Sequence, residues 1–295
     1  MVNKLIYNVC IMVCLIFFGH TITSCRTHKN LIALAHSDQA KREVLVVAHR
    51  ANIGDDLYPE NSLKTIEHCI ASGADILELD IRETKDQQLV IFHDKTLNRT
   101  TNGEGNVAEI SLEELKKLRL KHQDIVTDFT VPTLDEVLKL AKGKVYLDLD
   151  IKLESEDSYK RIVDLLRQHQ MEEEVLLFLY DKLDIERMHK LAPKTPILAR
   201  VYNKEDIAFV KKYPFIRFIH IDEKCYDADL MKELINQGYF VWLNSLGKFD
   251  QQEVSGKKGF ATFFNQYQHV NIVQTDYAQQ LKQYLKSTHK NGLNN

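Results

Sequence analysis

The sequence predicts an α/β fold, specifically a TIM (β/α)8 barrel with a β-hairpin at its second strand. Short apolar runs typical of strands alternate with segments whose apolar residues recur at helical spacing, over most of the 295 residues. Such alternation predicts a parallel sheet, and a closed barrel is its most common large form. Two strand-like runs lie too close in sequence to be parallel neighbours, so we expect them to form an antiparallel hairpin.

The strand-like runs support a count of eight parallel strands. They cover 44–48, 76–81, 89–92, 145–151, 175–180, 197–201, 216–221, 239–243 and 271–275. Only the loop 84–88 separates 76–83 from 89–92, so the run at 89–92 is the return strand of the hairpin. The other eight runs are separated by helix-like segments, one of which begins at Thr133 with Glu136 at capping-box spacing.

Composition excludes some classes of function. The formal net charge is -3 and no run of like charges marks an acidic or basic tail, so no nucleic-acid footprint is expected. Nothing in the sequence implies a protein partner. Only Cys69 and Cys225 lie in the predicted mature part, and two lone thiols predict neither a disulfide framework nor a metal site.

The N-terminus has the pattern of an export signal. Lys4 precedes an apolar run at 5–18, which is shorter than the roughly 20 residues of a membrane-spanning helix. Ile22-Thr23-Ser24-Cys25 follows and resembles a bacterial lipobox, in which the cysteine is lipidated. We therefore expect a lipoprotein signal at 1–24, a polar tether at 25–42 and the barrel at 43–290. A plain signal peptide cut elsewhere, or a short anchor helix, is the alternative.

A lipid on Cys25 would fix where the protein works. The acyl chains would hold it on a membrane, because each buried CH₂ contributes about 0.8 kcal/mol. The expected location is the bacterial cell envelope, on its periplasmic or outer-membrane face.

Residues able to do chemistry stand at the ends of predicted strands, where barrels carry their active sites. They are His49-Arg50, Glu78 and Asp80, His93-Asp94, Asp148 to Lys152, and Asp276. Glu78 and Asp80 are two apart on a strand, so both side chains point to one face. Such a pair repels unless it shares a proton or a cation, and Mg²⁺ or Ca²⁺ suits oxygen ligands. The alternative is a solvated pair of surface acids.

The hairpin adds a histidine to this face. A turn centred between Asp86 and Gln87 would place His93 directly opposite Asp80. Directly opposed residues share a face, so the imidazole would lie over the acid pair.

The order of the motifs along this sequence resembles that of the glycerophosphodiester phosphodiesterase family. The resemblance implies a lipoprotein form of that family and a barrel of the phospholipase-C-like type. The resemblance rests on His49-Arg50, Pro59-Glu60-Asn61-Ser62, Gly73 to Asp80, Thr84-Lys85-Asp86, His93-Asp94 and Asn98 to Gly103. It continues through Pro132 to Val137, Asp150-Ile151-Lys152, Trp242-Leu243-Asn244 and Thr275-Asp276-Tyr277. It therefore covers nearly the whole predicted mature chain.

The resemblance implies a role for each motif. His49 and His93 would be the general acid and base. A divalent cation, Ca²⁺ or Mg²⁺, would be held by Glu78, Asp80 and Asp150, and the phosphate would be bound by Arg50 and Lys152. Glu60 would orient Arg50 or contact a metal-bound water, and Asn61 and Trp242 would support the site. Two positions depart from the common pattern. Ala51 stands where many relatives have glycine, and Asp150 stands where many have the longer glutamate.

The implied reaction is metal-dependent hydrolysis of a glycerophosphodiester to glycerol phosphate and an alcohol. A neighbouring glycerol hydroxyl would attack the phosphorus, and water would open the resulting cyclic phosphate. One alternative is a phospholipase-C-like enzyme acting on inositol phospholipid. Another is a lipoprotein that binds phosphodiesters without cleaving them. The acid pair argues against the first and the two histidines argue against the second. The sequences of loops 52–58, 121–131 and 244–258 do not indicate which alcohol the substrate carries.

Overall fold

The computed structural model describes residues 31, 33, 43–54 and 57–292. The predicted signal, Cys25 and most of the predicted tether lie outside the described residues, so their boundaries stay predictions. No helix in the described part of the chain is long and apolar enough to cross a membrane.

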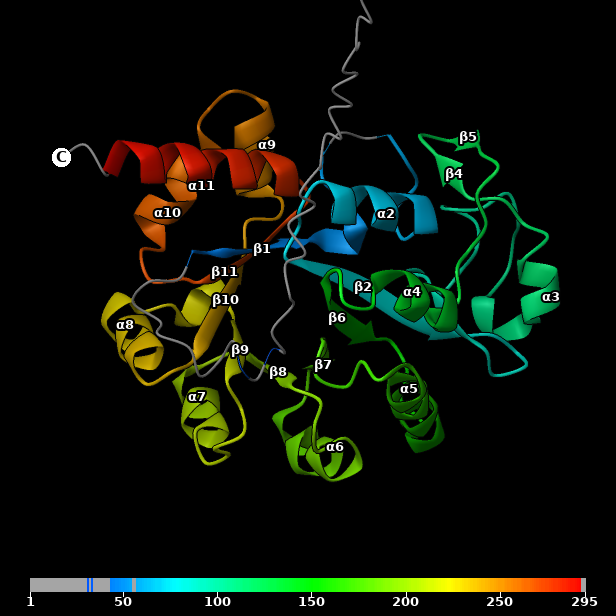
Figure 1. Cartoon of the computed structure of the whole chain (residues 1–295), viewed down its shortest axis with the longest axis horizontal. Coiled ribbons are helices and arrows are strands. Elements are labelled where there is room, and N and C mark those ends of the chain that lie inside the picture. The colour runs from blue at the N-terminus through cyan, green and yellow to red at the C-terminus, as the bar shows by residue number, and fades with distance from the viewer. Residues whose placement is uncertain (1–30, 32, 34–42, 55–56, 293–295) are drawn as a thin grey trace, which may run out of the picture.

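Eight parallel strands close into a barrel, as the sequence predicts (Figure 1). They are β1 (Leu45–Ala48), β2 (Ile76–Glu83), β6 (Tyr146–Ile151), β7 (Val175–Leu179), β8 (Ile197–Val201), β9 (Phe218–Ile221), β10 (Phe240–Asn244) and β11 (Ile272–Thr275). Each strand pairs with the next, and β1 pairs with both β2 and β11, which closes the ring.

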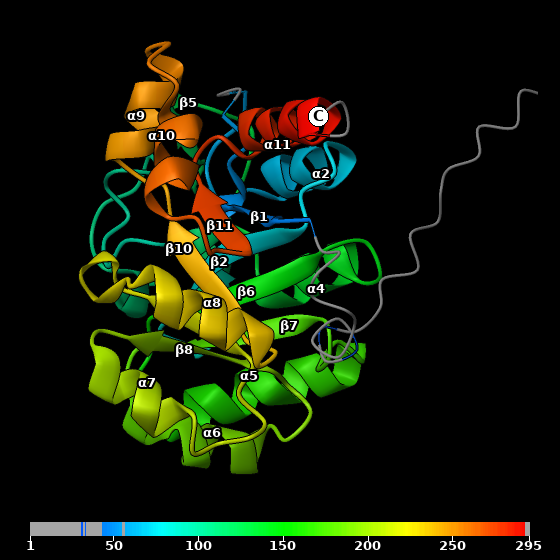
Figure 2. The same cartoon turned by 90° about the vertical axis from the view of Figure 1, so that its left-hand side faces the viewer.

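Helices surround the barrel (Figure 2). They are α2 (Leu63–Ala71), α3 (Leu112–Leu115), α4 (Leu134–Ala141), α5 (Glu156–His169), α6 (Ile185–Leu191), α7 (Lys204–Val210), α8 (Ala228–Asn236), α9 (Lys248–Val254), α10 (Gly259–Gln266) and α11 (Ala278–Gly292). The expected capping box begins α4, where Thr133 accepts from the Glu136 amide and the Glu136 side chain accepts from the Thr133 amide. The interval 244–258, expected to be a loop, instead contains α9.

The hairpin forms, but in a different register from the expected one. β3 (Leu89–Ile91) pairs antiparallel with β2, with Ile81 opposite Ile91. The turn centres on Asp86, because the Thr84 amide donates to the Gln88 carbonyl at 3.0 Å. The prediction that His93 lies directly opposite Asp80 is therefore wrong by one residue. After β3 the chain continues into a long excursion that includes α3 and the small hairpin of β4 (Lys121–His122) and β5 (Ile125–Val126).

The barrel interior changes from apolar to polar along its axis. Side chains near the N-terminal ends of the strands are apolar and buried, whereas those two residues further on are polar. Ile76 is followed by Glu78 on β2, and Phe218 is followed by His220 on β9. The apolar layer consists mainly of Val47, Ile76, Tyr146, Leu176, Phe178, Leu198, Phe218, Phe240, Trp242 and Ile272. It supports the floor of the polar mouth.

Leu31 belongs to this apolar layer. Its side chain is fully buried there, and its amide donates to the Glu173 carbonyl at 2.9 Å, just before β7. The sequence places Leu31 in a polar tether, yet it packs at the N-terminal end of the barrel, opposite the mouth. Burying one leucine contributes about 1.5–3 kcal/mol.

Candidate active site

A cavity of about 300 Å³ opens at the C-terminal ends of the strands. Six of the predicted residues line it: His49, Glu78, Asp80, His93, Asp150 and Lys152. Tyr180 and Asp148 are among the further lining residues. Residues from distant parts of the sequence thus meet at the face where a barrel enzyme carries its chemistry.

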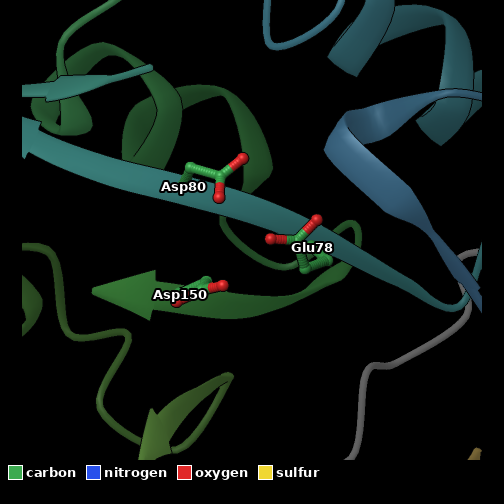
Figure 3. A group of neighbouring side chains, drawn as sticks. All are labelled: Glu78, Asp80 and Asp150. Carbon is green, nitrogen blue, oxygen red and sulfur yellow. The ribbon is translucent and has the colours of Figure 1, made fainter. Parts of the chain in front are cut away.

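Three of these residues form an acid cluster, which we define as Glu78, Asp80 and Asp150. Glu78 and Asp80 lie on one face of β2, and Asp150 is the register partner of Asp80 on β6 (Figure 3). One oxygen from each carboxylate lies within 4.8 Å of the others. Glu78 and Asp80 are buried, which rules out the alternative of a solvated surface pair.

The acid cluster fits a hard divalent cation. Burial, followed by the charges of Asp80, Asp150 and Asp148, raises the pKa of Glu78 well above its usual value. Burial likewise raises the pKa of Asp150 although Lys152 opposes this. Oδ1 of Asp150 and Oδ1 of Asp148 are buried without a hydrogen-bond partner. A bound Mg²⁺ or Ca²⁺ would coordinate these oxygens and would balance the negative charge of the carboxylates.

His49 and Arg50 leave the end of β1 in a strained turn. Arg50 and Ala51 have φ values of 51° and 55°, in the left-handed region. Glycine adopts this region freely, whereas alanine stores strain there. The Arg50 amide donates to Oε2 of Glu78 at 3.0 Å, which ties the turn to β2.

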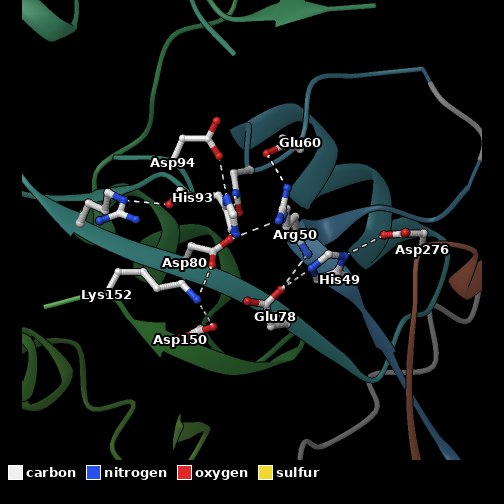
Figure 4. Close-up of polar contacts among 12 residues, drawn as sticks. His49, Arg50, Glu60, Glu78, Asp80, His93, Asp94, Asp150, Lys152 and Asp276 are labelled. Carbon is white, nitrogen blue, oxygen red and sulfur yellow. Dashed lines mark hydrogen bonds and ion pairs between the residues drawn. The ribbon is translucent and has the colours of Figure 1, made fainter. Parts of the chain in front are cut away.

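His49 is oriented by a carboxylate. Its Nδ1 lies 2.7 Å from Oδ1 of Asp276, just beyond β11, and its Nε2 lies 3.9 Å from Oε2 of Glu78 (Figure 4). The Asp276 amide in turn donates to Oδ2 of buried Asp250 at 2.8 Å. An Nδ1–H bonded to Asp276 leaves Nε2 directed at the cavity.

His93 has a similar carboxylate partner. It follows β3 in a loop, so contacts of the loop rather than strand alternation direct its side chain. Nδ1 of His93 lies 2.7 Å from Oδ1 of Asp94, and the His93 carbonyl accepts from Nε of Arg82 at 2.8 Å. The imidazole lines the cavity as predicted, although the register used to predict it is wrong.

An ion-pair chain connects the two ends of the site. Arg50 contacts Glu60 at 3.2 Å, Arg99 contacts Glu60 and Asp94 at 2.7 Å each, and Asp94 contacts His93. Burial alone would raise the pKa of Glu60, but Arg99 and Arg50 outweigh it and lower that pKa. Arg99, chiefly through its hydrogen bonds, also holds the pKa of Asp94 well below its usual value. Glu60 therefore lies within ion-pair distance of Arg50, and its role in orienting Arg50 stays a prediction.

Lys152 lies between the acids and the cavity wall. Its Nζ contacts Asp150, lies 3.4 Å from Oδ1 of Asp80 and donates to the Tyr180 hydroxyl at 2.8 Å. Burial acts to lower the pKa of Lys152, but Asp150 and Tyr180 outweigh burial and raise that pKa, so the ammonium stays charged. Nε of Arg50 lies 3.7 Å from Oδ2 of Asp80, which brings both predicted phosphate-binding residues to the same acid.

The two predicted supporting residues lie beneath the site. Nδ2 of Asn61 is 3.5 Å from Oδ2 of Asp80, at the limit of a hydrogen bond. Trp242 is fully buried in the apolar layer, and its Nε1 donates to Oδ1 of Asn244 at 3.1 Å. Asn244, rather than Trp242, reaches the cavity.

Sequence reasoning missed the roles of several residues in this arrangement. Asp148 had a signal, because it lies two residues before Asp150 and is the register partner of Glu78. Asp276 also had one, as an acid at a strand end. Tyr180 and Arg99 had no local signal, because their places depend on the barrel register and on the excursion after β3.

Comparisons with known proteins agree on one family. The model of the glycerophosphoryl diester phosphodiesterase family matches residues 49–237. A glycerophosphodiester phosphodiesterase of Caldanaerobacter subterraneus subsp. tengcongensis is 33% identical over 162 residues, or 52% of this chain and 65% of that protein. The match thus spans slightly less than two thirds of that relative.

Solved structures show the same fold. A glycerophosphoryl diester phosphodiesterase from Parabacteroides distasonis has a TM-score of 0.77 at 26% identity, covering 88% of this chain and 93% of that one. A phosphodiesterase of Oleispira antarctica, solved with the product sn-glycerol-3-phosphate, has a TM-score of 0.64 at 21% identity, covering 85% and 100%. At that identity the second likeness concerns the fold alone.

Proposed function

This chain belongs to the glycerophosphoryl diester phosphodiesterase family, and we propose that it hydrolyses glycerophosphodiesters to glycerol phosphate and an alcohol with the help of a divalent cation. The proposed product is the compound bound in the Oleispira antarctica phosphodiesterase. The observation that carries the proposal is the acid cluster with His49 and His93 on the wall of the same cavity.

Two histidines would move the protons. Each has Nδ1 beside a carboxylate, Asp276 for His49 and Asp94 for His93. This arrangement leaves each Nε2 able to accept a proton as a neutral ring or to donate one as a charged ring. One histidine would take the proton from the glycerol hydroxyl that attacks the phosphorus. The other histidine would give a proton to the oxygen of the departing alcohol. In the second step water would open the cyclic phosphate with the two roles reversed.

Positive charge would stabilise the phosphate oxygens as charge develops on them. Lys152 lines the cavity and Arg50 stands beside Asp80, so both would contribute positive charge to a phosphate bound between the histidines. The acid cluster would hold Mg²⁺ or Ca²⁺, which when bound supplies further charge stabilisation. The shorter Asp150 still places one oxygen within 4.8 Å of the other two carboxylates, so the change from glutamate does not remove the candidate ligand.

A substrate panel tests this proposal. Glycerophosphocholine and glycerophosphoinositol should both release glycerol phosphate in Mg²⁺ or Ca²⁺ and stop doing so in strong chelator. Cleavage of intact inositol phospholipid alone would favour the phospholipase-C-like alternative. Tight binding without product would favour the binding lipoprotein. Full turnover in chelator, with no metal on the purified protein, would remove the metal assignment.

We also propose that Cys25 is lipidated and that the protein is held in the bacterial cell envelope. The support is the sequence Ile22-Thr23-Ser24-Cys25 after a short apolar run. In an expressing bacterium, Cys25→Ser should abolish incorporation of radiolabelled fatty acid, whereas Cys225→Ser should retain it. Labelled Cys25→Ser protein, or a mature wild-type protein that begins at another residue, would contradict this.

A further inference from the structure

Two cavities continue outward from the active site past Lys152. The larger, about 500 Å³, shares Lys152, Phe178 and Tyr180 with the active-site cavity. The smaller, about 380 Å³, lies against the excursion after β3. Both are lined by Arg82, Lys95, Lys152 and Leu153. We call this shared wall the cationic junction.

We propose that the cationic junction binds an anionic group, such as a phosphate, on the leaving alcohol of the substrate. This inference rests on the proposed function, and it specifies the class of alcohol. A phosphodiester held at Lys152 has two arms. The three-carbon glycerol arm fits the inner cavity, so the larger arm would extend past Lys152 into the outer cavities.

Arg82 and Lys95 supply positive charge that the protein does not neutralise by direct contact. Within the described residues, neither side chain has a carboxylate oxygen within 4.0 Å, although Asp80, Asp94 and Asp150 act on the Arg82 guanidinium from a greater distance. Arg82 is half-buried, and in the described part of the chain its side chain makes one hydrogen bond, from Nε to the His93 carbonyl. Its two Nη groups thus remain available for bidentate contact with a phosphate.

The acids around the outer cavities do not cancel this charge at the junction. They are Glu83, Glu109, Glu154, Asp181 and Asp184. Glu83 is paired with Arg161 and Asp184 with Arg187, at 2.7 and 2.9 Å. The other three are exposed, so water and salt screen them. None of the five belongs to the wall that the two cavities share.

The position of Arg82 supports a role in binding substrate. Arg82 follows Glu78 and Asp80 at intervals of two on β2, so the three side chains share a face of the strand. The row runs from the acid cluster, which would hold a cation, to a guanidinium, which would hold an anion. A substrate with a second anionic group beyond its phosphodiester would match that order of charges.

The test compares glycerophosphoinositol with glycerophosphoinositol 4-phosphate, which differ only in the outer phosphate. The wild type should prefer the 4-phosphate by about tenfold in kcat/KM. Lys95→Ala should lower that preference by up to about fivefold, the range for one exposed ion pair. Turnover of glycerophosphoinositol itself should fall much less than turnover of the 4-phosphate, because Lys95 touches none of the reacting groups and glycerophosphoinositol lacks the outer phosphate.

Arg82 requires a second comparison, because it also holds the His93 carbonyl. Arg82→Gln should lower turnover of both substrates and also the preference for the 4-phosphate, whereas Arg82→Lys should retain most of the preference. Lys248→Ala is the matched control, because Lys248 is exposed at the start of α9 and lines neither outer cavity. It removes the same charge and should leave the preference intact.

The outcomes separate this inference from the proposed function. If no glycerophosphodiester is turned over with any divalent cation, the proposed function fails. Turnover without a preference for the 4-phosphate would overturn the inference alone. A preference that Lys95→Ala and Lys248→Ala reduce equally would also overturn it, because the effect would then come from net charge.

Discussion

Replacing Glu78 by glutamine should stabilise the cation-free protein and remove its response to divalent cations. Glu78 is buried and its carboxylate lies within 4.8 Å of two others. At that separation two unit charges repel by about 3 kcal/mol with an effective dielectric constant of roughly 20. Glutamine keeps an oxygen that can accept from the Arg50 amide, so the turn at β1 should be preserved.

The expected change is a rise of about 2–12 °C in the melting temperature of the cation-free protein. Lys152 already offsets part of the repulsion, so we expect a gain of about 1–3 kcal/mol, and each kcal/mol corresponds to roughly 2–4 °C for a domain of this size. Thermal unfolding is measured in chelator and again with millimolar Mg²⁺ or Ca²⁺. The wild type should gain about 2.7 kcal/mol at a cation concentration one hundred times Kd, and Glu78→Gln should gain little.

The pH dependence of the cation-free wild type has a defined sign. Burial and neighbouring charges raise the pKa values of Glu78, Asp148 and Asp150, so the folded state binds more protons than the unfolded state. Their contribution to stability is therefore fully present below the unfolded-state pKa, near pH 4, and falls as the pH rises through the raised values. Urea unfolding across this range should show that loss, and Glu78→Gln should reduce its slope.

Asp206→Asn serves as the control for these measurements. Asp206 is also buried, but Lys182 and backbone amides lower its pKa although burial opposes this. Its replacement should cost stability and leave the cation response intact. A Glu78→Gln protein that is less stable than wild type in chelator, or a wild type without any cation response, would refute the reasoning about the acid cluster.

Four further substitutions test other parts of the structure. His49→Ala and His93→Ala should each lower turnover about a hundredfold or more, and a substrate with a very good leaving alcohol should rescue only the variant that lacks the acid; equal rescue would contradict the two-histidine mechanism. Asp276→Asn should lower kcat about tenfold with little change in melting temperature, because a charge-assisted hydrogen bond to a half-exposed carboxylate contributes about 1.5 kcal/mol. Leu31→Ala should destabilise the protein by about 2–5 kcal/mol in urea unfolding, and a change under 0.5 kcal/mol would show that Leu31 does not pack in the barrel.

The barrel could be predicted from the sequence because its strands are short, apolar and separated by strongly periodic helices. The acid pair could also be predicted, since alternation along one strand fixes which side chains share a face. The hairpin register could not be predicted, because it depends on whether the Gln88 amide donates a hydrogen bond to the Thr84 hydroxyl across the turn. Contacts such as Asp276 with His49 join residues 227 positions apart and depend on barrel closure.

The burial of Leu31 at the N-terminal end of the barrel would give the anchored enzyme a defined orientation. Leu31 lies six positions after Cys25, and an extended chain of that length reaches at most about 20 Å. A lipid on Cys25 would therefore keep the base of the barrel close to the bilayer and turn the mouth, with its acids and histidines, toward the surrounding water. Substrates would then arrive by diffusion through that water, and lipids embedded in the anchoring leaflet would lie beyond the reach of His49 and His93.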